Sequence, residues 1–228
     1  MATAVGSAGP GDGAESPPSP DRPPKRLTAG ERRRQLFAVA LALFAERGYR
    51  ATTMDDVAEA AGVTKPLVYQ HFSSKRALYL ELVDSVAREL LAAVARATAA
   101  AEGPRQQVEM GFAAYFHMVV THEAAFRLLF GRADNQDEEL GEALRRVEVT
   151  IAEAIEPLIT AGLDNEHRRF LAFSVVGMAE GASRHWLAMR AAGGPAAGAV
   201  LAPEAEAQRL AGRLADLAWA GLRSVHAD

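Results

Sequence analysis

The residues best suited to chemistry lie in the stretch from Thr52 to Lys75, and their types favour binding over catalysis. Lys65 can donate to a guanine edge or to a phosphate, while Pro66 and Leu67 offer apolar contact to a thymine methyl group. Nearby hydroxyl, imidazole and ammonium groups have the reach for phosphate oxygens, which fix the register of a protein on DNA. The predicted DNA-binding residues are Thr53, Thr64, Lys65, Pro66, Leu67, Tyr69, Gln70, His71 and Lys75.

Two short helices joined by a tight turn are needed to hold these residues. Thr53 is a suitable N-cap for a helix over residues 54–61, and Gly62 is suited to the left-handed conformation that ends it. Thr64 then caps a second helix, with Pro66 in its first turn, where a missing amide proton costs little. A helix, a glycine-containing turn and a second helix within about twenty residues form a helix-turn-helix.

The second helix has one apolar side. Val68 and Phe72 stand four residues apart and are expected to pack inward, so the polar set faces outward. Their predicted partners are Val57, Ala61 and Val63. Any one of the outward residues could be an ordinary surface residue, and the DNA-binding interpretation depends on the whole set.

The span from Arg32 to Val83 resembles the DNA-binding domain of the TetR family of bacterial transcriptional regulators. The matching motifs are LFAERGY, TT, AGV, Y-x-HF and SK in their family order. The resemblance implies that Lys65, Pro66 and Leu67 approach bases, and that the residues Thr53, Tyr69, His71 and Lys75 hold phosphates. Leu67 departs from the Gly, Thr or Ala often found at its position, so the operator sequence stays open.

Length and composition indicate a two-domain protein. The chain has 228 residues, of which 49% are hydrophobic, and it contains no cysteine, which excludes disulfides and thiolate chemistry. No apolar run approaches the roughly 18 residues that span a bilayer, so we expect a soluble, cytoplasmic protein without a membrane partner. Residues 25–76 hold ten Lys or Arg against five Asp or Glu, whereas residues 77–228 hold fourteen against twenty-one. A basic segment on an acidic body suits a protein with one end on DNA.

The predicted fold is all-α, with about nine helices. Residues 1–24 are rich in Pro, Gly and Ser and are expected to be a disordered tail without a signal peptide, although Lys25 to Arg34 could lie along DNA. Residues 25–75 form the predicted helix-turn-helix domain, whose first helix spans about 29–47 and ends at Gly48. Residues 76–228 form a larger helical domain, entered by a long helix over 75–101. Further helices are expected near 105–121, 123–130, 137–160, 165–190 and 204–225, with Pro157 shortening or kinking the third of these.

Large apolar residues at helical spacing in the larger domain are mostly core, but they also allow an apolar ligand cavity. The predicted ligand-binding residues are Phe112, Tyr115, Phe116, Phe126, Phe130, Ile155, Phe173, Met178 and Trp186. No group of His, Asp or Glu has convincing metal-site spacing, and no cofactor is expected. Small residues between large ones in the last two helices favour a homodimer interface, since helix-turn-helix proteins read paired half-sites.

A second resemblance concerns the ligand. The patches FRLLFGR, VVGMAEGASRHWLA and LAWAGLRSV are similar to actinobacterial TetR regulators of fatty-acid and lipid metabolism, which sense long-chain acyl-CoA. The resemblance implies that such a ligand releases the dimer from a palindromic operator. Two alternatives stay open: a multidrug-efflux repressor of the same family, and a helical lipid carrier without DNA binding. An enzyme is not expected, because no phosphate-binding glycine loop or nucleophile motif is present.

Overall fold

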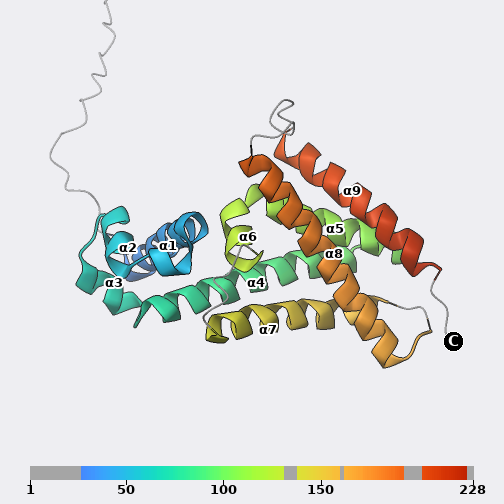
Figure 1. Cartoon of the computed structure of the whole chain (residues 1–228), viewed down its shortest axis with the longest axis horizontal. Coiled ribbons are helices and arrows are strands. Elements are labelled where there is room, and N and C mark those ends of the chain that lie inside the picture. Colours follow the sequence, from blue (N-terminus) through green and yellow to red (C-terminus); the bar gives the residue numbers. More distant parts are fainter. Residues whose placement is uncertain (1–26, 131–137, 160–161, 193–201, 225–228) are drawn as a thin grey trace, which may run out of the picture.

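The computed structural model describes residues 27–130, 138–159, 162–192 and 202–224, and every regular element in these ranges is helical (Figure 1). The elements are α1 (Ala29–Ala51), α2 (Met54–Ala60), α3 (Lys65–His71), α4 (Lys75–Ala99), α5 (Pro104–Thr121), α6 (Glu123–Phe130), α7 (Glu138–Ile155), a 3-10 turn η1 (Glu156–Leu158), α8 (Asn165–Ala191) and α9 (Pro203–Leu222). The all-α prediction is confirmed. The tail at 1–24 and the basic residues Lys25 and Arg26 lie outside the described residues.

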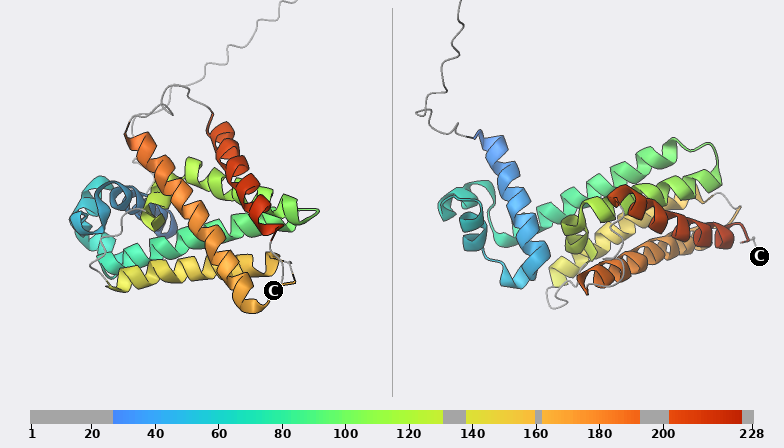
Figure 2. Two further views of the ribbon diagram at one scale, coloured as in Figure 1. Left: turned by 45° about the vertical axis from the view of Figure 1, so that its right-hand side comes forward. Right: turned by 90° about the horizontal axis from the view of Figure 1, so that it is seen from above.

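Helix α4 joins the two parts of the molecule. Helices α1, α2 and α3 lie together at its N-terminal end, while the other helices lie along its remaining length (Figures 1 and 2). One hydrophobic core nevertheless runs through both parts, from Leu36 and Val68 at one end to Phe116 and Val176 at the other. The division at residue 75 therefore remains a prediction, since the apolar packing is continuous across it.

Two helix ends follow from single residues. Gly48 has a φ of 80° and interrupts the helical backbone of α1. Beyond this kink the helix continues only as far as Ala51. Pro157 cannot continue an α-helix because it lacks the amide proton, and α7 ends at Ile155 with Pro157 inside the 3-10 turn. Proline thus shortens this helix, as predicted.

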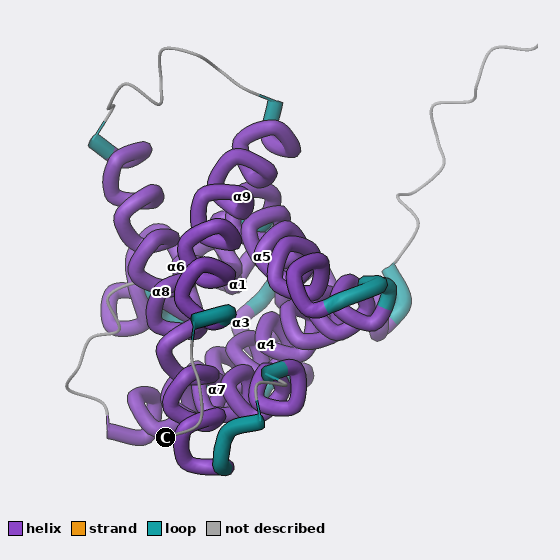
Figure 3. Tube along the Cα trace, turned by 90° about the vertical axis from the view of Figure 1, so that its right-hand side faces the viewer, coloured by secondary structure: helices purple, strands orange, loops and turns teal. Residues whose placement is uncertain are grey.

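The larger part is a bundle seen almost end-on in Figure 3. Helix α5 packs between α4 and α9, α7 packs against α8, and α6 packs against α1. No described helix is both long and apolar enough to cross a membrane. The contact between α6 and α1 joins the larger bundle to the three-helix end.

Candidate DNA-binding surface and ligand cavity

The start of α2 is fixed by a reciprocal capping box. The Thr53 hydroxyl accepts from the Asp56 amide at 3.1 Å, and the Asp56 carboxylate accepts from the Thr53 amide at 2.7 Å. Hydrogen bonds from Thr53 hold the pKa of Asp56 below its usual range. The predicted N-cap is confirmed, and Thr53 lies exposed on the surface beside α3.

The turn after α2 is a Schellman motif. The Gly62 amide donates to the Glu59 carbonyl at 3.0 Å, and the Val63 amide donates to the Ala58 carbonyl at 2.9 Å. Gly62 has a φ of 65°, the left-handed conformation that glycine adopts without steric cost. The backbone therefore reverses within a few residues, and α3 starts at a fixed angle to α2.

Helix α3 buries one side and exposes the other. Val68 is 0% exposed and Phe72 is 3% exposed, while the Arg33 guanidinium lies 4.7 Å from the Phe72 ring centroid. Tyr69 is 45% exposed. Thr64 stands at the N-cap, but its side chain makes no capping hydrogen bond. The predicted DNA-binding residues divide into two groups. Thr53, Thr64, Lys65, Pro66, Tyr69 and Gln70 are exposed, and Leu67, His71 and Lys75 are half-buried.

Lys65 is held by a carboxylate in the free protein. Its ammonium group lies 2.9 Å from the Asp55 carboxylate at the start of α2, and this hydrogen bond raises the pKa of Lys65. Both side chains are more than half exposed, so solvent screens their attraction. Lys65 therefore stays charged and can exchange Asp55 for another acceptor.

Lys75 is placed differently from Lys65. Its ammonium group donates to the carbonyls of Tyr49 and Thr52, each at 2.9 Å, and lies 4.3 Å from the Tyr49 ring centroid. The residue thus ties the start of α4 to the end of α1. The structure shows this anchoring role, and phosphate contact by Lys75 remains a prediction.

Tyr79 connects the three-helix end to α6. Its ring centroid lies 5.2 Å from that of Phe44 and 5.0 Å from that of Tyr49, both in edge-on geometry. The Tyr79 hydroxyl donates to the carbonyl of Leu128 in α6 at 3.4 Å. Burial raises the pKa of Tyr79 to about 12, so the hydroxyl stays protonated and keeps this donor role at neutral pH.

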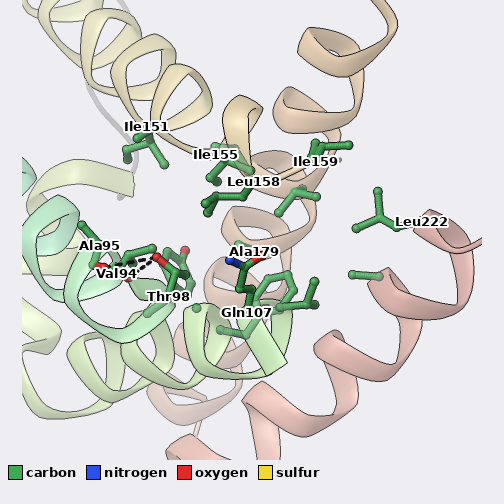
Figure 4. A pocket seen from close by; sticks show the side chains of 18 of the residues that line it. Val94, Ala95, Thr98, Gln107, Ile151, Ile155, Leu158, Ile159, Ala179 and Leu222 are labelled. Atoms are coloured by element: carbon green, nitrogen blue, oxygen red, sulfur yellow. Dashed lines mark hydrogen bonds between the residues drawn. The ribbon is translucent and has the colours of Figure 1, made fainter. Parts of the chain in front are cut away.

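A cavity of about 690 Å³ lies in the larger domain (Figure 4). Side chains from α4, α5, α6, α7, η1, α8 and α9 line it, and nearly all of them are apolar, including Val94, Ile151, Leu158 and Leu222. This volume is in the range of about 300–1,000 Å³ that holds small-molecule ligands. The polar lining residues are Thr98, Gln107, Tyr115, Trp219 and Arg223.

Four of the nine predicted ligand-binding residues line this cavity, namely Phe112, Tyr115, Phe130 and Ile155. The other five lie elsewhere. Phe116 and Phe126 are buried in an aromatic cluster with Tyr115, Phe173 and Met178 pack half-buried against the core, and Trp186 donates to the Glu206 carboxylate at 3.0 Å. Sequence reasoning missed the walls from α4 and α9, although Leu91, Val94 and Thr98 stand at helical spacing on α4.

Trp186 belongs to a partly buried charged network between α8 and α9. Glu206 is only 5% exposed, yet it pairs with Arg190 and Arg209, each at 3.3 Å. Arg190 also stacks on the Trp186 ring at 4.9 Å. In the described part of the chain, no group of three or more His, Asp or Glu side chains could hold a metal ion.

The outer faces of α8 and α9 carry exposed apolar residues. Phe170 is 67% exposed and Leu217 is 60% exposed. On the same helices, a Cβ atom added at Gly177, Gly181 or Gly221 would meet nothing within 4 Å, so the surface there is open. These faces are unoccupied by the described residues of this chain.

Comparison with known proteins identifies the family to which the helix-turn-helix segment is similar. Residues 36–82 match the family described as bacterial regulatory proteins, tetR family. The chain is 31% identical over 177 residues to the HTH-type transcriptional activator FasR of Mycolicibacterium smegmatis, which covers 77% of this chain and 81% of that protein.

Solved structures share the fold. A TetR-like regulator from Rhodococcus sp. RHA1 superimposes with a TM-score of 0.67 at 23% identity, covering 88% of this chain and all of that one. The fatty acid degradation regulator FadR from Bacillus halodurans superimposes with a TM-score of 0.68 at 15% identity, covering 83% of this chain and 97% of that one.

Proposed function

The chain belongs to the TetR family of bacterial transcriptional regulators and is a DNA-binding regulator rather than an enzyme, and we propose that it is a homodimer released from a palindromic operator by a long-chain fatty acyl-CoA. The observation that carries this proposal is the pairing of an exposed recognition helix with an apolar cavity in one chain. DNA contact would use the N-terminal half of α3, where Lys65, Pro66 and Leu67 would face the major groove. The protein would bind DNA in the cytoplasm, where bacterial DNA is located.

The outer faces of α8 and α9 support the dimer. Exposed Phe170 and Leu217 would be covered by a second copy, and the glycines allow two helices to approach closely. A two-fold axis through these faces presents two α3 helices to two half-sites of the same DNA. The α8 and α9 faces thus complete the reading unit.

The cavity supports an apolar effector. Its lining offers many methyl, methylene and aromatic groups and few polar ones, which suits an alkyl chain. The FadR structure from Bacillus halodurans is that of a fatty acid degradation regulator, which favours an acyl chain over other apolar molecules. A multidrug-efflux repressor with the same fold is the second candidate, because an apolar cavity also accepts aromatic drugs.

A continuous set of contacts can couple the cavity to α3. Phe130 lines the cavity at the end of α6, and the Leu128 carbonyl of α6 accepts from Tyr79. Tyr79 packs on Tyr49, whose carbonyl accepts from Lys75 at the start of α4. A ligand that displaces Phe130 would therefore change the position of α1 and of the start of α4, which directly follows α3 in the chain. Release of the DNA requires that the ligand bind the DNA-free state of the protein more tightly than the DNA-bound state.

A gel-shift titration tests the proposal. The purified protein is mixed with DNA flanking its own gene at several salt concentrations, with palmitoyl-CoA, free CoA or an aromatic drug. Specific binding that is lost with palmitoyl-CoA and kept with free CoA supports the acyl-CoA regulator. Loss of binding only with the drug supports the efflux-type candidate. Absence of specific binding to all of these DNA fragments contradicts the proposal that an operator lies beside the protein's own gene.

A further inference from the structure

Arg223 is the only charged residue among the described residues that line the cavity. It follows the last residue of α9 and its side chain is exposed. No carboxylate of the described residues forms an ion pair with it. Asp216, the acidic residue of α9 nearest to it along the helix, is paired instead with Arg105 at 3.5 Å. The guanidinium is therefore available to an anion at the cavity rim.

The cavity has an open end and a closed end. Its exposed lining residues lie near the ends of α4, α7 and α9 and at the start of α5, and they are Ala95, Ala99, Pro104, Ala154 and Arg223. Figure 1 places these helix ends on the side of the molecule away from α3. At the opposite end, Phe130 and Tyr115 are only 7% and 8% exposed. An elongated ligand must therefore enter with its apolar end first.

We propose that the cavity binds a single-tailed amphiphile whose tail runs toward Phe130 and whose anionic head is held by Arg223 at the rim. The inference rests on the proposed function, in that the effector is an acyl compound. At about 30 Å³ for each water-sized group, 690 Å³ holds roughly twenty non-hydrogen atoms. That is room for a long alkyl chain but not for a nucleotide head, which must stay outside.

The chemistry of Arg223 fits such a head. A guanidinium presents a planar set of N–H donors that matches a carboxylate or a phosphate in bidentate fashion and stays charged at any physiological pH. Both a free fatty acid and an acyl-CoA carry an alkyl chain and an anionic head. Arg223 therefore distinguishes charged amphiphiles from uncharged ones of the same chain length.

Direct binding measurements on the full-length chain test this inference. Isothermal titration calorimetry is carried out with palmitate, palmitoyl-CoA and hexadecanol on the wild-type protein and on Arg223→Gln. The matched control is Arg213→Gln, which removes a charge from an exposed position of α9 that does not line the cavity. Tryptophan emission gives a second readout, because Trp219 lines the cavity and the other of the two tryptophans does not.

Arg223→Gln is expected to weaken binding of the anionic ligand by roughly threefold to tenfold and to leave hexadecanol unchanged. Weakening confined to palmitate identifies a carboxylate head, and weakening confined to palmitoyl-CoA identifies a phosphate. Equal affinities of the wild type and Arg223→Gln for both anions overturn the inference, as does equal weakening by Arg213→Gln.

The inference and the proposed function can fail separately. If palmitate binds through Arg223 but no operator is bound in the gel shift, the operator assignment fails and the ligand orientation stands. If operator binding is specific but none of the three amphiphiles binds the protein, the ligand class proposed for the cavity is wrong and the DNA-binding function stands.

Discussion

The three-helix end and the larger helical bundle differ in where their predicted binding groups lie. In helices α1 to α3 the binding groups lie outside, on α3, and the interior is filled by Leu36, Val57 and Val68, all 0% exposed. In the larger bundle four of the nine predicted ligand-binding residues lie inside, around a cavity of about 690 Å³. A surface that must fit a groove requires a rigid support, whereas a site that must admit a flexible chain requires space between its walls.

Helix ends are fixed in similar ways in both regions. Helix α2 begins with a capping box and ends with a Schellman motif, and Lys75 satisfies the carbonyls where α1 ends. In the bundle, the Asp164 side chain caps α8 by accepting from the His167 amide. Helices α3, α5 and α9 have proline in the first turn and no side-chain capping bond. The two regions therefore differ in where their binding groups lie and not in how their helices begin.

The largest expected effect comes from removing one phenylalanine from each region. Phe72→Ala is expected to lower the free energy of unfolding by about 3–5 kcal/mol, because Phe72 is enclosed by α1 and α3. Phe112→Ala is expected to cost less, about 2–3 kcal/mol, because one side of its ring already borders the cavity. Urea unfolding of both variants measures the difference, and equal losses would show that the two interiors are packed alike.

Next in size is the contrast between the two lysines. Lys75→Met is expected to lower the free energy of unfolding by about 1–3 kcal/mol, because it leaves the Tyr49 and Thr52 carbonyls without their donor. Lys65→Met removes only a screened surface pair, so its stability is expected to match the wild type while base preference on operator variants relaxes. Thermal unfolding and gel shifts on both variants measure the two effects. A stability loss with Lys65→Met and none with Lys75→Met would reverse the assigned roles.

Tyr69→Phe gives a smaller effect on DNA affinity alone. If the exposed hydroxyl donates to a phosphate, its removal is expected to weaken binding about threefold to tenfold on every sequence. Unfolding and palmitoyl-CoA binding are expected to stay unchanged, because Tyr69 is distant from the cavity lining. Fluorescence anisotropy on specific and random DNA measures the affinity, and an effect on specific DNA alone would make Tyr69 a base-reading residue.

The smallest effect is a loss of stability at alkaline pH, and it concerns Tyr79, which connects the two regions. Burial raises the pKa of Tyr79 from 10.0 to about 12, so its contribution to stability is complete below pH 10 and is lost as the pH rises toward 12. Tyr79→Phe is expected to make this alkaline loss smaller but not to abolish it, because burial also raises the pKa of Tyr115. Urea unfolding at pH 8 and pH 11 tests this, and identical pH dependence in both proteins would show that Tyr79 ionises as freely when folded as when unfolded.

The sequence was most informative where a structural feature depends on neighbouring residues. Thr53, Gly62 and Pro157 each indicated a helix boundary, since capping, left-handed backbone and a missing amide proton act within one turn of a helix. The inward positions of Val68 and Phe72 followed from helical periodicity in the same way. The whole predicted DNA-binding set lies within 23 consecutive residues, from Thr53 to Lys75.

The cavity was only partly predicted, because it depends on which helices meet. Aromatic residues at helical spacing could be core or lining, and only the packing of α4, α5, α7, α8 and α9 distinguished Phe112 from Phe116. Helix α4 was expected to act as a connector, yet its Leu91, Val94 and Thr98 form one wall.

The sequence by itself determined the family, the all-helical fold and the composition of the α3 surface, because these depend on local motifs and on periodicity within single helices. Tertiary structure alone decided that Lys75 anchors carbonyls of α1, that Tyr79 reaches α6, and that Arg223 stands at the rim of the cavity. Each of these contacts joins residues at least 23 positions apart or from several helices, and such distances are set by packing of the whole chain rather than by any short pattern in it.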